Sequence, residues 1–152
     1  MNVIEAPEEV NINNQFSVFL AGSIEGDKAT KWQDIIIQNL TKEEIVILNP
    51  RRLSWDSSWK QEISNPIFKE QVTWELQALE QADMIIMYFD KTTKSPITLL
   101  ELGLFAKSKK LTVCCPKGFW RKGNVDIVCE HYNIKQVDTI EELIEKVKKE
   151  LK

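Results

Sequence analysis

The chain has 152 residues, 43% of them hydrophobic and 28% charged, and a formal net charge of −3. These are ordinary values for a single soluble globular domain, and they give no electrostatic basis for binding a nucleic acid polymer. No apolar run approaches the roughly 20 residues that cross a bilayer, so we expect no membrane partner.

The N-terminal segment indicates where the domain begins. Residues 1–14 are acidic and polar, and we expect a mobile lead-in before one domain at residues 15–152.

The cysteines indicate the compartment. The three cysteines are an odd number, and Cys114 and Cys115 are adjacent in a predicted strand, where they face opposite sides of the sheet. A disulfide framework is therefore not favoured, and the composition indicates a reducing cytoplasm.

Apolar periodicity predicts strands that alternate with helices. The predicted strands are residues 16–21, 44–48, 84–89, 111–115 and 134–137. The predicted helices begin after residue 27, near 68, at 95, near 125 and near 140, with Asp27 as the cap of the first. Because several strands are continuously apolar, we expect an α/β protein with a doubly wound parallel sheet of about five strands and helices on both faces.

Ligands of such sheets bind beyond the carboxyl ends of the strands, at the switch point of the topology. This rule selects four loops, at residues 22–27, 49–66, 90–95 and 116–124. The first, with Gly22 and Gly26, is typical of a phosphate or sugar cradle or of a plain tight turn. Residues 51–59 include Arg51 and Trp55, which suit either stacking on a base or a small packed lid.

Two glutamates stand out in predicted helices. Glu101 has apolar neighbours on every side of its helix, so it is paired, protonated or exposed in a pocket, or it is an ordinary half-exposed residue. Glu75 borders the apolar stripe of the preceding helix and is either an edge residue or a catalytic one. Two carboxylates that converge beside a sugar are the arrangement that retaining glycosidases use.

Three stretches of the chain carry a family likeness. They are Phe-Leu-Ala-Gly-Ser-Ile at residues 19–24, Trp-Glu-Leu-Gln-Ala-Leu-Glu-Gln-Ala-Asp at 74–83 and Ser-Pro-Ile-Thr-Leu-Leu-Glu-Leu-Gly at 95–103. Together they resemble the nucleoside 2-deoxyribosyltransferase superfamily, including its 2′-deoxynucleoside 5′-monophosphate N-glycosidases. The resemblance implies a flavodoxin-like sheet and an enzyme that transfers or hydrolyses the base–sugar bond of a nucleoside or nucleotide.

The resemblance also implies roles for individual residues. Glu101 matches the nucleophile that forms a glycosyl ester at C1′, and Glu75 stands where relatives usually carry an aspartate that contacts the sugar. Ser23 and Ser95 match positions that bind phosphate in the nucleotide-hydrolysing branch. With the loop residues above, the predicted substrate-binding set is Gly22, Ser23, Ile24, Arg51, Trp55, Asp90, Ser95 and Asn124. The implied chemistry requires no metal or redox cofactor, and members are commonly homo-oligomers in which a neighbouring subunit completes the pocket.

The implied mechanism sets a condition on Glu101. Attack requires an ionised carboxylate, so we expect the pocket to supply hydrogen bonds that hold its pKa down. Residues 51–59 and 119–124 lie outside the matched stretches and indicate a subfamily with its own substrate, such as a modified nucleotide or a dinucleotide. The Arg and Lys of residues 119–122 either meet a phosphate or stay solvated. The alternative reading is a nucleotide-binding or signalling module with the same fold and no turnover.

Overall fold

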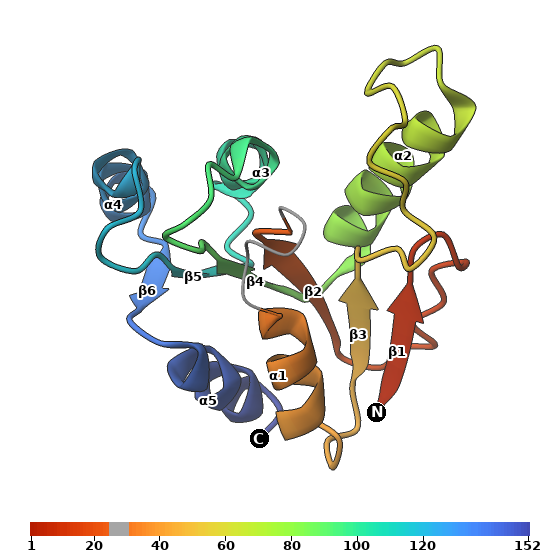
Figure 1. Cartoon of the computed structure of the whole chain (residues 1–152). Coiled ribbons are helices and arrows are strands. Elements are labelled where there is room, and N and C mark those ends of the chain that lie inside the picture. Colours follow the sequence, from red (N-terminus) through yellow and green to blue (C-terminus); the bar gives the residue numbers. More distant parts are fainter. Residues whose placement is uncertain (25–30) are drawn as a thin grey trace.

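The computed structural model describes residues 1–24 and 31–152, and within them it shows a parallel sheet between two layers of helices (Figure 1). The strands are β1 (Asn2–Glu5), β2 (Ser17–Gly22), β3 (Val46–Asn49), β4 (Met84–Tyr88), β5 (Leu111–Cys114) and β6 (Lys135–Val137). The helices are α1 (Trp32–Asn39), α2 (Pro66–Gln81), α3 (Pro96–Phe105), α4 (Lys122–His131) and α5 (Ile140–Glu150). None of these helices combines the length and the hydropathy that a membrane span requires.

The strand order is β1-β3-β2-β4-β5-β6, and every pair of neighbours is parallel. From β2 the chain moves outward to β3, then returns through α2 to β4 on the other side of β2. The direction of winding therefore reverses between β2 and β4, whose carboxyl ends form the switch point. Helices α2, α3 and α4 cover one face and α1 and α5 the other (Figure 1), which confirms the predicted doubly wound α/β fold.

The two helical layers explain why the predicted strands read as continuous apolar runs. Successive side chains of a strand point to opposite faces, so a strand covered on both sides buries all of them. In β2, Phe19 and Ala21 join the core beneath α2, α3 and α4. Val18 and Leu20 of the same strand join the core beneath α1 and α5.

Residues 1–14, which we expected to be a mobile lead-in, include the edge strand β1. It pairs with β3 in parallel, with Ile4 opposite Leu48, and Ile4 is buried. The following segment is tied to α2, because the indole nitrogen of Trp74 donates to the Glu8 carbonyl oxygen at 2.6 Å. The sheet thus gains a strand beyond the five predicted, because pairing with β3 outweighs the weak intrinsic signal of a four-residue segment.

Gly22 ends β2 where a side chain would not fit. A Cβ there would collide with the Tyr88 carbonyl oxygen and with the Trp32 ring. The same carbonyl accepts a hydrogen bond from the Ser23 amide at 3.1 Å, so the loop after β2 lies directly against the end of β4. The predicted helix cap Asp27 lies outside the described residues.

Candidate functional site

A cluster of buried hydroxyl groups occupies the switch point. Ser23 follows β2, while Thr93 and Ser95 lie in the loop between β4 and α3. The Ser23 and Ser95 hydroxyls are hydrogen bonded to each other, and the Thr93 hydroxyl lies 3.0 Å from the first and 2.7 Å from the second. The Ser23 hydroxyl also accepts from the Asp90 amide at 2.8 Å. The structure therefore brings together three residues predicted separately, Ser23, Asp90 and Ser95.

The loop between β4 and α3 is shaped by its own side chains. The Asp90 carboxylate accepts from the Thr92 amide at 2.9 Å and from the Thr92 hydroxyl at 2.6 Å, which closes a tight turn. Ser95 adopts a left-handed conformation, with φ 47° and ψ 52°, immediately before Pro96. The left-handed conformation costs a non-glycine residue about 1 kcal/mol. The Ser95 hydroxyl makes no cap bond to α3 and instead joins the buried hydroxyl cluster.

Glu101 lies on the inward face of α3, two turns beyond this cluster. Thr98, Glu101 and Leu102 are the buried residues of the helix, and the rise per residue places Glu101 roughly 9 Å along the axis from Ser95. Glu101 is only 8% exposed. Such burial disfavours the charged form, and it raises the pKa of this carboxyl to about 8, with a further upward contribution from Glu75.

Glu75 approaches Glu101 from α2. Its pKa is also raised, chiefly by burial, while a hydrogen bond from Gln71 opposes the shift. The Gln71 amide nitrogen donates to Glu75 Oε1 at 3.1 Å and to the Pro50 carbonyl oxygen at 2.9 Å, so it links α2 to the segment after β3. The two carboxyls form an electrostatically coupled pair in which a single proton is favoured over none.

One expectation about this pair is wrong. We expected hydrogen bonds to keep the pKa of Glu101 low, yet its carboxyl has no hydrogen bond within residues 1–24 and 31–152. Burial on α3 and the nearby Glu75 charge act together, and both raise the pKa. Without substrate, Glu101 is therefore mostly protonated at neutral pH.

Within residues 1–24 and 31–152, the remaining predicted residues make no hydrogen bond or ion pair with either carboxyl. Ile24 is 43% exposed, and the Arg51 amide bonds the Asn49 side chain at 3.2 Å. Trp55 packs edge-on against Trp59 at 5.1 Å between ring centroids, as the packed-lid alternative describes. Asn124 is exposed in the first turn of α4, because that helix begins earlier than predicted. No hydrogen bond or ring contact joins Trp55 or Asn124 to either carboxyl in the described part of the chain.

Sequence reasoning missed two polar residues of the site, Gln71 and Thr93. Gln71 precedes Glu75 by four residues on a predicted helix, a spacing at which side chains meet, and that signal was available. Thr93 lies in a loop already selected by the strand-end rule, but nothing in its local sequence indicates that its hydroxyl is buried between two serines.

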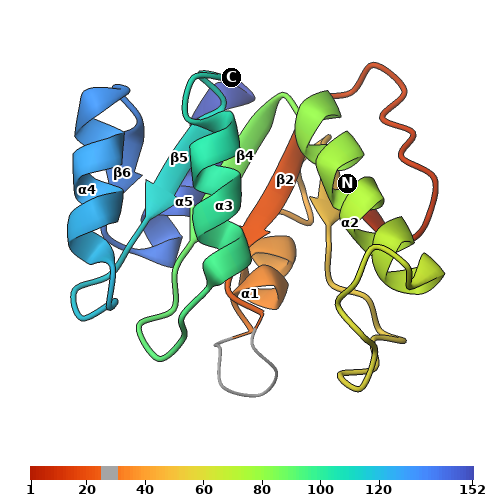
Figure 2. The same ribbon diagram turned by 90° about the horizontal axis from the view of Figure 1, so that it is seen from above.

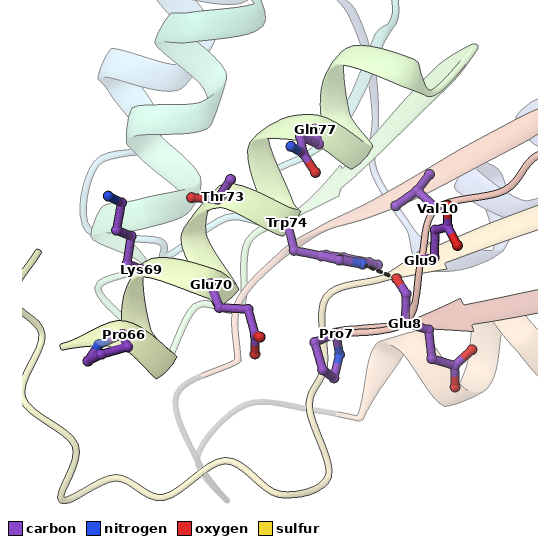
Figure 3. Close-up of a pocket in the computed structure, with 10 residues that line it drawn as sticks. All are labelled: Pro7, Glu8, Glu9, Val10, Pro66, Lys69, Glu70, Thr73, Trp74 and Gln77. Atoms are coloured by element: carbon purple, nitrogen blue, oxygen red, sulfur yellow. Dashed lines mark hydrogen bonds between the residues drawn. The ribbon is translucent and has the colours of Figure 1, made fainter.

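A groove of about 500 Å³ lies elsewhere, between α2 and the segment after β1 (Figure 3). Its walls are Pro7, Glu8, Glu9, Val10, Pro66, Lys69, Glu70, Thr73, Trp74 and Gln77. None of the predicted site residues lines it, so its size does not make it the candidate site. Within the described residues, no three His, Cys, Asp or Glu side chains gather so that they could hold a metal ion.

Comparison with known proteins identifies a family and a similar fold. A family model described as nucleoside 2-deoxyribosyltransferase like matches residues 15–119, which include every residue of the carboxyl pair and the hydroxyl cluster. The fold is similar to the crystal structure of a conserved protein from Enterococcus faecalis V583, with a TM-score of 0.65 and 13% identity. That similarity covers 90% of this chain and 99% of the other. Comparison with curated proteins gives no match.

Proposed function

Because the chain belongs to the nucleoside 2-deoxyribosyltransferase-like family, we propose that it cleaves the N-glycosidic bond of a nucleoside or nucleotide. The observation that carries this proposal is the pair of the buried Glu101 and the partly buried Glu75, whose pKa values are both raised. Two carboxyl groups in one low-dielectric site supply a nucleophile and a proton donor, which is the pairing that retaining glycosyl chemistry needs.

In the proposed mechanism the pair holds one proton, and the reactive form carries it on Glu75. The ionised Glu101 attacks C1′ and forms an ester, while the base leaves with the electrons of the C–N bond and takes the proton of Glu75. In a transfer reaction, a second base displaces Glu101 from C1′ and gives its N–H proton to the Glu75 carboxylate, which restores the pair. In hydrolysis, water attacks the ester and the Glu75 carboxylate accepts its proton, which restores the pair.

A specific observation also favours a second candidate, a nucleotide-binding or signalling module without turnover. Glu101 has a pKa of about 8 in the substrate-free protein, so only about a tenth of it is ionised at pH 7. A site that does not react has no need to ionise this group. The two candidates therefore differ in whether bound nucleotide loses its base.

The test is base release from a panel of nucleosides, 5′-monophosphates and NAD, followed by chromatography with and without a second free base. We expect release in the native protein and none in Glu101→Gln, and dependence on added base would identify a transferase. Ligand-induced melting shifts without release from any compound would contradict the enzyme and support the binding module.

We further propose that the chain forms a homo-oligomer in which a neighbouring subunit covers α3 and completes the pocket. Ile97, Leu100 and Leu104 follow one another at helical spacing on α3 and are 57%, 59% and 58% exposed. On the adjacent α4, Ile127 is 70% exposed. Large exposed apolar side chains that gather on neighbouring helices are typical of a protein interface.

Leu100→Lys should therefore shift the protein to a smaller species in size-exclusion chromatography with light scattering. Leu53→Lys is the matched control, because Leu53 is 92% exposed in the loop of residues 51–59, away from α3. A monomeric native protein, or an oligomer that survives Leu100→Lys intact, would contradict this interface.

The cysteines support a cytoplasmic location. Cys114, Cys115 and Cys129 are all buried free thiols. Burial raises the pKa of Cys115 to about 12 and the pKa values of Cys114 and Cys129 to about 11, so all three stay protonated at neutral pH. Thiols held in this form suit a reducing compartment.

A further inference from the structure

A buried acceptor beside the carboxyl pair has no donor. Within residues 1–24 and 31–152, the buried side-chain polar atoms without a hydrogen bond are Oε1 of Gln71 and both amide atoms of Gln33. Gln33 belongs to α1, which lies on the opposite face of the sheet from α2 and α3 (Figure 1). Gln71 lies on α2, is only 4% exposed and is hydrogen bonded to Glu75. Its unpaired oxygen therefore belongs to the candidate site.

The hydrogen bonds of Gln71 determine which way its amide faces. The nitrogen donates to the Pro50 carbonyl oxygen at 2.9 Å and to Glu75 Oε1 at 3.1 Å. The reverse orientation would place the amide oxygen against the Pro50 carbonyl oxygen, and a carbonyl oxygen can only accept. Both hydrogens of the nitrogen are thus in use, and Oε1 is held as an acceptor. A buried acceptor without a donor is unfavourable, so a ligand that supplies the donor gains affinity.

Gln71 and the two carboxyls come from neighbouring helices. Helices α2 and α3 lie side by side on one face of the sheet, and both begin at its carboxyl edge (Figures 1 and 2). Gln71 precedes Glu75 by one helical turn. The charge of Glu75 in turn reaches Glu101 and raises the pKa of that carboxyl. A substrate whose C1′ lies between the two carboxyls therefore brings its sugar close to Gln71.

The covalent structure of a nucleoside limits which donor can meet Oε1. C1′ is bonded to the ring oxygen, to a nitrogen of the base and to C2′. The ring oxygen and that nitrogen carry no hydrogen, so the donor nearest to the scissile bond is a hydroxyl on C2′. The amino groups of adenine, guanine and cytosine lie further away, across the ring of the base. Retaining glycosidases use hydrogen bonds to the equivalent hydroxyl, and these bonds strengthen in the transition state.

We propose that Gln71 Oε1 accepts a hydrogen bond from the 2′-hydroxyl of the substrate, so that the substrate class is ribonucleosides or ribonucleotides. This assignment rests on the proposed glycosyl function, which places C1′ between Glu75 and Glu101. A 2′-deoxy sugar would bring only C–H groups to Oε1 and would leave it unpaired. A site that hydrogen bonds a substrate hydroxyl rejects the analogue without it for this reason.

Binding can be measured apart from turnover in Glu101→Gln. We would titrate the 5′-monophosphates of adenosine, guanosine, cytidine and uridine, and their 2′-deoxy counterparts, by calorimetry. The proteins are Glu101→Gln alone and the same variant with Gln71→Met or Gln77→Met added. Methionine has a similar length but no amide, and Gln77 is the matched control because it is exposed on the same helix.

We expect the ribonucleotide that binds most tightly to exceed its 2′-deoxy counterpart in affinity by at least about tenfold. That ratio should approach one when Gln71→Met is added and should not change with Gln77→Met. Gln71→Met also removes the hydrogen bond to Glu75, but that loss affects both members of a pair alike. The ratio therefore isolates the bond to the 2′-hydroxyl.

A second measurement does not depend on the folding of Gln71→Met. A 2′-deoxy-2′-fluoro nucleotide keeps a substituent on C2′ that cannot donate a hydrogen bond. We expect it to bind Glu101→Gln as weakly as the 2′-deoxy nucleotide does. Binding of the fluoro compound as tight as that of the ribonucleotide would overturn the proposal.

Three further results would also overturn it. They are equal affinity for ribonucleotides and 2′-deoxynucleotides in Glu101→Gln, binding of none of the compounds, and a ratio that Gln71→Met leaves unchanged or that Gln77→Met changes equally. A ratio that falls only with Gln71→Met supports the ribose assignment even if the native protein releases no base. That absence of release would instead refute the glycosyl function.

Turnover then tests the same bond in the reaction. Base release from each ribonucleotide and its 2′-deoxy counterpart would be compared in the native protein and in Gln71→Met with Glu101 intact. The two sugars differ in intrinsic reactivity, but that difference is the same in both proteins and cancels. We expect the ratio of kcat/KM for the ribo and deoxy substrates to fall by at least about tenfold in Gln71→Met. Base release with the same ratio in both proteins would leave the glycosyl function standing and refute the ribose assignment.

Discussion

Glu101→Gln is expected to abolish base release and, in the same protein, to stabilise the fold above pH 8. The loss of activity should be at least about a thousandfold, because the amide that replaces the proposed nucleophile cannot form the ester. Glutamine preserves the shape of the side chain but neither ionises nor attacks. A residue kept for packing alone would produce no such loss.

The gain in stability follows from the raised pKa of Glu101. The carboxyl titrates near 4.5 when unfolded and near 8 when folded, so between these values the folded state binds the extra proton. Its contribution to stability is fully present below about pH 4.5 and is lost as the pH rises through 8. Glutamine carries no such pH-dependent cost, so above pH 8 the free energy of unfolding should exceed that of the native protein by a few kcal/mol, at most about 5.

Urea unfolding of both proteins at pH 5 and pH 8.5 measures this difference. The matched control is Glu80→Gln, which removes an exposed carboxyl from α2. It should leave the free energy of unfolding unchanged at both pH 5 and pH 8.5. Parallel pH dependence in Glu101→Gln and the native protein would show that the carboxyl is not held in a desolvated site. Undiminished base release would show that Glu101 is not the nucleophile.

The fold could be predicted because most of its strands carry strong local signals. β2 and β4 are covered on both faces, so β2 consists of apolar or small residues that end at Gly22 and β4 of apolar residues that end at Tyr88. β1 carries no such signal, since only Val3 and Ile4 are apolar in its four residues. Its strand conformation depends on pairing with β3, more than 40 residues away, which no local pattern encodes.

The residues of the candidate site could be predicted in part, but their electrostatics could not. The strand-end rule selected the loops that carry Ser23 and Ser95, while Glu101 and Glu75 were selected by their apolar helix surroundings and by the family likeness. The pKa of Glu101, however, depends on its burial and on the charge of Glu75. Glu75 accepts a hydrogen bond from Gln71, which also donates to the Pro50 carbonyl oxygen, 21 residues earlier in the chain. The local sequence could show that Glu101 has apolar neighbours. It could not show that, within the described residues, Glu101 lacks hydrogen bonds that would offset the rise in its pKa.

The pH dependence of the reaction should reveal the coupling between the two carboxyls. In the native protein we expect kcat/KM to fall as the pH rises through about 8, because the pair then loses the single proton that the leaving base takes. The Glu75 charge is the second cause of the raised pKa of Glu101, after burial. Glu75→Gln removes that charge, so Glu101 should ionise at lower pH and the limb of the pH profile that it controls should move below pH 8.

The same substitution removes the proposed proton donor, so the maximal rate should fall by about a hundredfold or more. A nucleoside of 7-methylguanine needs no such donor, because its base is already cationic and leaves without taking a proton. Glu75→Gln should therefore retain most of its activity on that substrate while it loses activity on guanine nucleosides. The control is Glu80→Gln, which removes an exposed carboxyl from the same helix. It should change neither the pH profile nor the relative activity on guanine and 7-methylguanine nucleosides.

The two readouts of Glu75→Gln separate its two roles. A shifted limb with no rescue by the methylated base would mean that Glu75 tunes Glu101 but donates no proton. Rescue with an unmoved limb would mean that Glu75 donates the proton from too far away to influence the ionisation of Glu101. Only the shift and the rescue together fit one coupled pair that shares a single proton and passes it to the leaving base.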